Sequence, residues 1–457
     1  MINLDDALVS RKEALLKKVN ALQIACSFPP KQPMGALRNY RIAVLLAKNF
    51  GNLHIITSKK TGEQVQAKNM TIQQVETFDY KNIVRLFKSK SDTPAIPEFK
   101  KPSLLWWWAV RLLDTIPFNI LVGEGGLAYV WNAYRQASRL IKELQINLVY
   151  TSFRPYADVL VSWLLKRKFP HLCWVADFRD PHVDPNRRNV FFPRLQHRIN
   201  RAIFSKADIV TTVSGGLAKH FRQYHPDIQV VLNGFPEALL QAAGEKSLPN
   251  SKFTITYTGS LYYGWQSADV LWKSLAKLIN EGKIAPDKIR IVYAGKDQSL
   301  WREWMRQYKL ENISEIHPYL AHNTSLQLQQ RSDLNLMLTW SSSKLSGILT
   351  GKLFEYIAVQ KPVLAIVQGE KDQEILDIFS DTNAGLCTLN EDAFLEKTEN
   401  FILELYRNWL RDGHTGWQFK KDQLLQYSAE QQFDLLLEKL EKFFPVAAHS
   451  DQNSRVL

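Results

Sequence analysis

The stretch SSSKLSGILTGKLFEYIAVQKPVLAI, Ser341 to Ile366, predicts a loop, a helix and a buried strand in succession. Small residues crowd the loop, the helix begins near Thr350, and the apolar run after Pro362 is typical of a strand in a parallel sheet. A helix start leaves backbone N–H groups unpaired and carries the positive end of the helix dipole, so this loop is a candidate anion site. The alternative for any single loop of this kind is an ordinary helix start capped by Thr350.

The same alternation of strand and helix continues along most of the chain. A first series predicts strands at 21–28, 52–58, 148–152, 172–177, 209–213 and 230–232, and a second series predicts strands at 254–258, 289–294, 334–338 and 363–366. We therefore expect an α/β fold of two doubly wound Rossmann-like domains that face each other across a cleft. The expected boundaries are 1–240 for the first domain, 241–252 for a linker, 253–425 for the second domain, 426–445 for a C-terminal helix that could pack back on the first domain, and 446–457 for a frayed tail.

Composition places the chain among folded, multi-domain proteins. It has 457 residues, of which 45% are hydrophobic and 23% are charged. The three cysteines have no paired or metal-binding spacing, which favours a reducing compartment. Residues 1–240 contain 34 Lys and Arg against 18 Asp and Glu, a charge of +16, whereas residues 241–457 contain 24 against 27, a charge of −3. The basic half indicates an anionic partner, which could be a membrane surface, a nucleic acid or an acidic substrate.

Loops rich in Gly, Ser or charged residues follow the predicted strands. They lie at 28–38, 177–184, 214–216, 233–234, 259–264, 295–298 and 341–351. In open α/β sheets, ligands bind beyond the carboxyl ends of the strands near the point where the strand order reverses. One such loop means little, but seven loops drawn from both halves indicate a binding cleft between two domains.

Several segments occur in an order that resembles a known enzyme family. They are FPPKQPMGALRNYRIAVLLAKNFGNLHIITS from Phe28, ADFRDP from Ala176, ADIVTTVS from Ala207, LNGFPE from Leu232, ITYTGSLY from Ile255, IRIVYAG from Ile289 and TGKLFEYIAVQKPVLAI from Thr350. Together they resemble the GT-B glycosyltransferases, specifically the retaining enzymes of glycosyltransferase family 4 (group 1), over roughly residues 22–440. The resemblance implies a nucleotide-sugar donor and a saccharide or lipid-linked acceptor, in cell-surface polysaccharide or glycolipid synthesis.

The resemblance places the donor on the second domain. Backbone amides of Gly347, Thr350, Gly351 and Lys352 would bind the diphosphate, and Glu355 would hold the ribose. Further donor contacts would come from Gly259, Ser260, Gly295 and Tyr319, the last of which (or Leu320) would pack on the base. Two features depart from the family pattern: Gly347 stands where many members have a glutamate, and no basic residue follows Gly259 and Ser260. We hypothesise that Lys352 or Lys344 supplies the missing charge.

The acceptor and the reacting carbon would lie against the first domain. The candidate catalytic residues there are Asp177, Arg179 and Asp180, because a carboxylate can orient an acceptor hydroxyl and an arginine can stabilise charge on the leaving phosphate. The candidate acceptor-binding residues are Gly35, Arg38 and His182. The alternative for residues 177–180 is a surface cluster of ion pairs, with Pro181 ending the strand.

The sequence has no DxD or HExxH motif, and its ten histidines show no metal-ligand spacing, so we expect neither a metal nor another cofactor.

The segment with Trp106, Trp107 and Trp108 is flanked by basic residues, which is typical of an interfacial helix on an anionic membrane; a cap over the domain or a protein contact is the alternative. We expect a cytoplasmic protein, with peripheral association to the inner face of the membrane as an option. Other functions that remain open are a nucleotide-sugar epimerase or hydrolase, a donor-binding pseudoenzyme, and a nucleic-acid-binding protein, although no nucleic-acid-binding motif is present.

Overall fold

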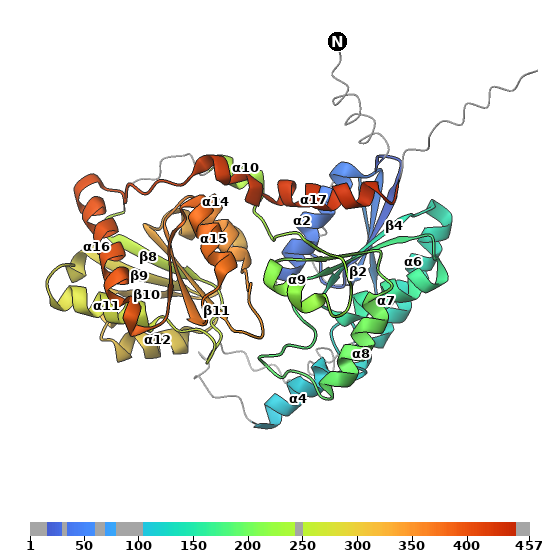
Figure 1. Cartoon of the computed structure of the whole chain (residues 1–457), viewed down its shortest axis with the longest axis horizontal. Coiled ribbons are helices and arrows are strands. Elements are labelled where there is room, and N and C mark those ends of the chain that lie inside the picture. Colours follow the sequence, from blue (N-terminus) through green and yellow to red (C-terminus); the bar gives the residue numbers. More distant parts are fainter. Residues whose placement is uncertain (1–15, 30–33, 60–68, 79–103, 243–249, 445–457) are drawn as a thin grey trace, which may run out of the picture.

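The computed structural model describes residues 16–29, 34–59, 69–78, 104–242 and 250–444. They form two α/β lobes that lie side by side (Figure 1). The first lobe is built on a seven-stranded sheet and the second lobe on a six-stranded sheet, and the described strand pairs of both sheets are parallel. The expected fold class, two doubly wound domains, is confirmed.

The two sheets share one topology. The first has the strand order β3–β2–β1–β4–β5–β6–β7 and the second β10–β9–β8–β11–β12–β13. The strands are β1 (Asn20–Ile24), β2 (Asn52–Ser58), β3 (Met70–Val75), β4 (Leu148–Phe153), β5 (Cys173–Phe178), β6 (Ile209–Thr212), β7 (Ile228–Val230), β8 (Phe253–Thr258), β9 (Ile289–Ala294), β10 (Ser314–His317), β11 (Leu334–Ser341), β12 (Val363–Gly369) and β13 (Gly385–Leu389). The strand order therefore reverses between β1 and β4 in the first lobe and between β8 and β11 in the second. These two switch points are where this topology places a ligand.

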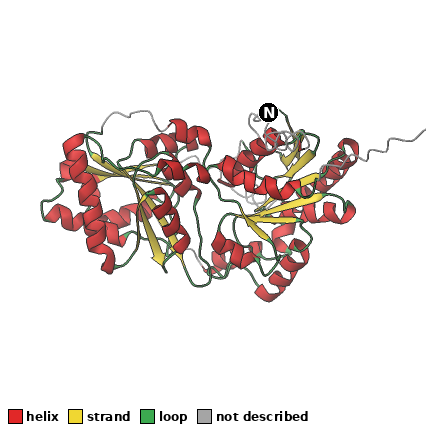
Figure 2. Ribbon diagram, turned by 45° about the horizontal axis from the view of Figure 1, so that its top comes forward, coloured by secondary structure: helices red, strands yellow, loops and turns green. Residues whose placement is uncertain are grey.

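Helices cover both faces of each sheet (Figure 2). Those of the first lobe are α2 (Met34–Asn49), α4 (Leu104–Asp114), α5 (Phe118–Leu121), α6 (Gly126–Leu144), α7 (Tyr156–Lys168), α8 (Pro193–Phe204) and α9 (Gly215–Phe221). Those of the second lobe are α11 (Asp269–Asn280), α12 (Gln298–Gln307), α13 (His322–Gln330), α14 (Gly351–Ala358), α15 (Gln373–Thr382) and α16 (Leu395–Asp412). No helix among the described residues is both long and apolar enough to span a bilayer.

The C-terminal helix returns to the first lobe. After α10 (Glu237–Ala242) the chain enters the second lobe, and α17 (Ala429–Glu441) crosses back along the edge seen at the top of Figure 1. Phe433, Leu436 and Leu440 of α17 are buried in the same hydrophobic cluster as Leu46 and Phe50 of the first lobe. Each such side chain contributes about 1.5–3 kcal/mol when it is fully buried, so α17 anchors the end of the chain to the first lobe.

Some predicted segments lie outside the described residues. These are the start of the first domain up to residue 15, most of the linker at 243–249 and the tail at 446–457. The side chain of Trp106 is also outside them, whereas Trp107 and Trp108 belong to α4.

Candidate functional site

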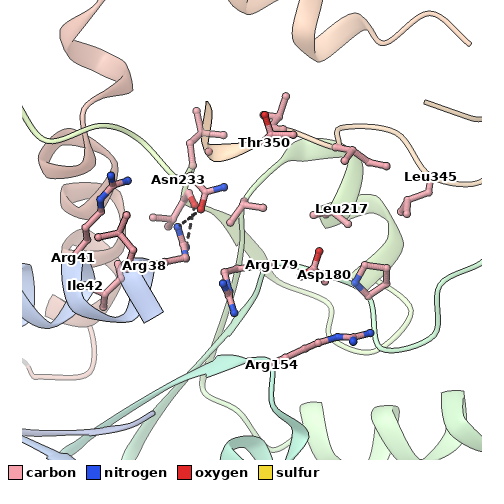
Figure 3. A pocket seen from close by; sticks show the side chains of 18 of the residues that line it. Arg38, Arg41, Ile42, Arg154, Arg179, Asp180, Leu217, Asn233, Leu345 and Thr350 are labelled. Carbon is pink, nitrogen blue, oxygen red and sulfur yellow. Dashed lines mark hydrogen bonds between the residues drawn. The ribbon is translucent and has the colours of Figure 1, made fainter. Parts of the chain in front are cut away.

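A pocket of about 380 Å³ lies between the two lobes (Figure 3). Its wall in the first lobe comes from α2 and from the loops after β4, β5, β6 and β7, and its wall in the second lobe comes from the loops after β8 and β11 and from the start of α14. The polar and aromatic residues that line it include Arg38, Arg41, Arg154, Arg179, Asp180, Asp184, Arg187, Asn233, Tyr262, Trp340 and Thr350. Because β1, β4, β8 and β11 flank the two switch points, the pocket lies where a doubly wound fold binds ligands.

Arg38 is held in place by Asp177. The guanidinium donates to both carboxylate oxygens, from Nε to Oδ2 at 3.0 Å and from Nη2 to Oδ1 at 2.8 Å. Its Nη1 donates to Asn233 Oδ1 at 3.0 Å (Figure 3). Ser152 Oγ and Thr211 Oγ1 also donate to the carboxylate, each at 2.9 Å. Burial alone would raise the pKa of Asp177, but the charge and hydrogen bonds of Arg38 bring that pKa below its usual value.

These contacts correct the prediction that Asp177 is catalytic. Its side chain is fully buried, it does not line the pocket, and both of its oxygens are occupied. We therefore assign Asp177 to positioning Arg38, which does line the pocket.

Arg179 and Asp180 point into the pocket from the loop after β5 (Figure 3). Arg179 Nε donates to the carbonyl of Phe153 at 3.3 Å, and no carboxylate of a described residue lies within ion-pair distance of this guanidinium. Burial lowers the pKa of Arg179, and the charges of Asp180 and Asp177 oppose this shift. An arginine that is largely desolvated and lacks a direct ion pair is well suited to bind an anion.

Gly35 on α2 leaves the space that this arginine needs. A Cβ atom on residue 35 would lie 3.0 Å from both Nη1 and Nη2 of Arg179. Such contacts are shorter than van der Waals distance, so any side chain at this position would displace the guanidinium. Gly35 therefore affects the pocket indirectly, because its lack of a side chain allows the observed position of the Arg179 guanidinium.

Sequence analysis missed three further arginines that line the pocket: Arg41, Arg154 and Arg187. Arg41 could have been predicted from the sequence. It lies three positions after the candidate Arg38, and residues three apart on a helix lie on the same face. Arg154 had no such signal. It follows β4, and its Nη1 lies 3.5 Å from Asp114 Oδ1 at the end of α4.

Arg187 connects the two lobes. Its guanidinium carbon lies 5.4 Å from the ring centre of Tyr262 and 5.2 Å from that of Trp340, both of which belong to the second lobe. The neighbouring Asn186 accepts a hydrogen bond from Ser342 Oγ at 3.0 Å. The loop after β8 lacks the basic residues that many members of the resembled family carry there. The guanidinium of Arg187, from the opposite lobe, lies beside Tyr262 of this loop.

The start of α14 presents unpaired hydrogen-bonding groups to the pocket. Thr350 and Gly351 both line it. Among the described residues, the backbone N–H groups of Thr350, Gly351 and Lys352 find no acceptor. An N-cap threonine ordinarily accepts a hydrogen bond from the first turn through its side chain, yet Thr350 Oγ1 is buried without a partner in the described structure. Buried polar groups are seldom unpaired in native proteins, so this helix start is a candidate ligand site.

Glu355 lies one turn into α14 and is also incompletely satisfied. Its side chain is 3% exposed, and its Oε1 has no hydrogen-bond partner among the described residues. Two basic side chains lie near this oxygen without reaching hydrogen-bond distance: the guanidinium of Arg41, with Nη2 at 3.6 Å, and the imidazole of His322, with Nε2 at 3.8 Å. Burial lowers the pKa of His322, so Arg41 is the charged one of the two. The other oxygen, Oε2, is 3.5 Å from Gln329 Nε2. A carboxylate held in this way can accept hydrogen bonds from a ligand hydroxyl.

Gly347 and Lys352 lie differently from what the sequence predicted. The N–H of Gly347 already donates to Asp372 Oδ2 at 2.7 Å, so this amide is not free for a diphosphate. Lys352 does not line the inter-lobe pocket. Its ammonium lies 4.5 Å from the centre of the Tyr257 ring, and a Cβ atom on Gly259 would overlap it. The lysine thus reaches the turn after β8 that lacks basic residues of its own.

Burial sets the protonation of this lysine. It lowers the pKa of Lys352 to about 8, although the charges of Glu355 and Asp297 act in the opposite direction. At pH 7 the side chain therefore remains mostly charged, and it loses its charge at about two pH units below an ordinary lysine.

The remaining predicted donor residues follow three neighbouring strands: Gly259 and Ser260 follow β8, Gly295 follows β9, and Tyr319 follows β10. Gly259 has a φ angle of +115°, which favours glycine, and a Cβ atom on Gly295 would overlap the Gly259 carbonyl. Ser260 accepts a hydrogen bond at its carbonyl from Tyr257 at 2.9 Å. Tyr319 is exposed, and Lys296 Nζ lies 4.8 Å from its ring centre. These four residues do not line the inter-lobe pocket.

His182 is not part of the inter-lobe pocket. It is 3% exposed, and its ring nitrogens lie 3.1 Å from Asn200 Oδ1 and 3.0 Å from the Asp114 carbonyl. Burial lowers the pKa of His182, partly offset by these hydrogen bonds. It lines a different pocket, below α4. His182 therefore does not lie beside Arg179 in the cleft, as the sequence had suggested, and its role in acceptor binding stays a prediction.

Glu374 of the second lobe, which the sequence did not suggest, holds the lobes together. Its Oε1 accepts from the N–H of Gly215 at 2.7 Å and its Oε2 from that of Gly216 at 3.1 Å, at the start of α9 in the first lobe. The helix dipole and the two amides favour a negative charge here. Burial nevertheless raises the pKa of Glu374, with the two amide hydrogen bonds opposing the shift.

No protein-family model and no curated protein sequence matches the chain. Among solved structures, the chain resembles α,α-trehalose-phosphate synthase (UDP-forming) from Burkholderia xenovorans, with 11% identity, a TM-score of 0.58, and coverage of 93% of this chain and 100% of the other. It also resembles sucrose-phosphate synthase from Thermosynechococcus elongatus, with 12% identity, a TM-score of 0.54, and coverage of 93% of this chain and 100% of the other. A third similar structure is a glycosyltransferase from Rickettsia africae, with 14% identity, a TM-score of 0.55, and coverage of 94% of this chain and 100% of the other. These likenesses show that the two lobes have the GT-B fold; at such identities they concern the fold alone.

Proposed function

We propose that this chain is a glycosyltransferase that moves a sugar from a nucleotide-sugar donor to a saccharide or lipid-linked acceptor. The observation that carries the proposal is the start of α14, where Thr350 Oγ1 and Glu355 Oε1 are buried without hydrogen-bond partners in the described structure. These groups lie at or next to a pocket that five arginines line. A ligand with hydroxyl groups at one end and a diphosphate at the other could form hydrogen bonds with these buried oxygens and ion pairs with the arginines.

The donor would bind mainly to the second lobe. The free N–H groups at the start of α14 would hold the diphosphate, with Lys352 close to the turn at Gly259. Glu355 would accept hydrogen bonds from the ribose hydroxyls. The exposed ring of Tyr319 offers a surface for the base.

The reaction would take place between this donor and the first lobe. As the bond between the sugar and the diphosphate breaks, negative charge develops on the leaving phosphate, and Arg179 is placed to stabilise it. Asp180 lines the pocket and makes no hydrogen bond or ion pair with a described residue, so its carboxylate is free to orient the acceptor hydroxyl and accept its proton. Arg38, fixed by Asp177, would bind the acceptor.

Two finer features of the proposal concern the chemistry. We infer transfer without a metal ion, because the pocket carries several guanidinium groups that can balance the charge of a diphosphate. Retention of the anomeric configuration, and a role in cell-surface polysaccharide or glycolipid synthesis, rest on the resemblance to family 4.

Turnover of donor with and without acceptor tests the proposal. Purified protein in EDTA would be incubated with UDP-, GDP-, ADP- and dTDP-sugars, and release of the nucleoside diphosphate would be followed. We expect release with one donor, strongly stimulated by an acceptor extract and lost in the Glu355→Gln variant. Release that is independent of any acceptor would instead indicate a hydrolase or an epimerase.

A further inference from the structure

We propose that the protein docks on an anionic lipid bilayer through an exposed face of the first lobe, here called the α4–α8 surface. It consists of apolar side chains on α4 and at the start of α8: Leu104, Leu105, Trp107, Trp108, Leu112, Phe192 and Leu195. In Figure 1, α4 lies at the edge of the first lobe opposite α10 and α17. The docking does not depend on the proposed activity.

The α4–α8 surface exposes far more apolar side chain than a typical soluble surface. Leu105 is 82% exposed, and Leu104 and Phe192 are each 73% exposed. Single exposed apolar residues are normal, but a group on adjacent segments usually marks an interaction site. Tryptophan and leucine together are typical of helices that lie at the lipid headgroup level.

Packing contacts hold this surface rigid. The ring of Trp108 stacks on Phe191 with 5.1 Å between ring centres, which joins α4 to the segment before α8. Arg111 adds to this junction: its guanidinium carbon lies 4.4 Å from the Phe191 ring centre, and its Nε donates to the Val190 carbonyl at 3.0 Å. The exposed side chains are therefore presented by an ordered scaffold.

Phe192 is the least expected member of the surface. Its φ angle is +49°, in the left-handed region that large residues rarely adopt, and its side chain still points to solvent. Packing within the protein does not explain a strained, exposed phenylalanine. Insertion of the exposed ring into a bilayer would give this side chain the apolar surroundings that the protein itself does not provide.

The charge around the surface selects an anionic partner. The sequence from residue 185 to 207 contains Arg187, Arg188, Arg194, Arg198, Arg201 and Lys206 and no Asp or Glu. Arg194, Arg198 and Arg201 are exposed on α8, whose buried face is formed by other residues. Basic side chains next to an apolar surface attract it to acidic lipids, and the attraction falls with ionic strength.

A second pocket lies between α4 and the cleft. It has a volume of about 440 Å³ and is lined by Ala109, Val110 and Leu113 of α4, together with His182 and Arg154. Arg154 also lines the inter-lobe pocket. If the proposed function holds, this pocket lies next to the site of transfer and offers room for part of a lipid-linked acceptor.

Vesicle sedimentation tests the proposal with the full chain. We expect binding to phosphatidylcholine vesicles that contain phosphatidylglycerol, little binding to phosphatidylcholine alone, and release at high salt. The double variant Leu105→Ser/Phe192→Asn should lose at least about ten-fold in vesicle affinity, because it removes exposed apolar groups that make few contacts in the protein. The variant Arg194→Glu/Arg198→Glu should bind anionic vesicles no better than neutral ones.

The control is Leu410→Ser, which removes a side chain that is 52% exposed on α16 of the second lobe and should bind vesicles like wild type. Unchanged melting temperature and donor binding in all variants would show that folding and the proposed function are intact. Equal vesicle binding by wild type and the Leu105/Phe192 variant would overturn the proposal, as would absence of binding by wild type. A concentration-dependent dimer that the same variant abolishes would also overturn it and assign the surface to a second copy of the chain.

Discussion

Arg41 in the first lobe and Glu355 in the second face each other across the cleft, with Nη2 3.6 Å from Oε1. Burial lowers the pKa of Arg41, although the Glu355 carboxylate acts to raise it. The distance is short enough for charge attraction and too long for a hydrogen bond. Arg41 thus attracts the carboxylate while Oε1 keeps its capacity to accept a hydrogen bond from a ligand.

Glu355→Gln removes the charge of this acceptor and keeps its shape. We predict that the affinity for the donor falls about ten- to hundred-fold, since hydrogen bonds to charged groups contribute about 1.5–3 kcal/mol. Isothermal titration calorimetry measures this. Glu404→Gln, at an exposed position on α16, is the matched control and should bind like wild type. Equal affinities in the two variants would remove Glu355 from the donor site.

Gly35→Ala should change stability and activity in opposite directions. Alanine favours a helix over glycine by up to about 1 kcal/mol, so the melting temperature should stay the same or rise. The new methyl group would press on the Arg179 guanidinium, and we expect kcat/KM to fall several-fold. In an Arg179→Ala background the same change should have no effect on kcat/KM. A similar loss in both backgrounds would show that Gly35 acts by another route.

Lys352 should take up a proton when the donor binds. Its pKa is lowered to about 8, so at pH 8 about half of the side chains are neutral, and a nearby diphosphate would raise the pKa again. Donor affinity should therefore fall as the pH rises above 8. Calorimetry at pH 8 in buffers of different ionisation enthalpy should show net proton uptake in wild type and none in Lys352→Met. Uptake that persists in this variant would assign the proton to another group.

Asp177→Asn should destabilise the first lobe strongly. Removing one partner of a buried ion pair leaves the other charge uncompensated, which costs about 3–5 kcal/mol. Because the pKa of Asp177 is below its usual value in the folded protein, its contribution is present above the unfolded-state pKa and is lost as the pH falls below it. Urea unfolding at pH 7 measures the loss. A variant with unchanged stability but reduced kcat would instead restore the catalytic assignment.

Much of the fold could be predicted from the sequence, because buried parallel strands are continuous apolar runs. The strand Ile289–Ala294 was predicted with its observed bounds, and most others were within a few residues. The strands β3, β10 and β13 were missed. Each is an edge strand that is only partly buried, so its sequence lacks the continuous apolar run of a central strand.

The site was predicted only where chemistry follows from local sequence. The start of α14 and the loop with Arg179 and Asp180 were identified, since small or charged residues followed a strand. Contacts between distant segments could not be seen in this way. Asp177 and Arg38 are 139 positions apart, and the ion pair that removes Asp177 from the pocket depends on the pairing of β1, β4 and β5. The same holds for Glu374, which bonds to Gly215 from 159 positions away.

The thermal stability of the protein with a panel of UDP-, GDP-, ADP- and dTDP-sugars in EDTA tests the central claim most directly. A ligand that binds the folded state stabilises it by mass action. We predict that one donor raises the melting temperature of wild type in the absence of divalent cations and that Glu355→Gln largely abolishes the rise. No rise with any donor, or an equal rise in both proteins, would contradict a donor site at the start of α14.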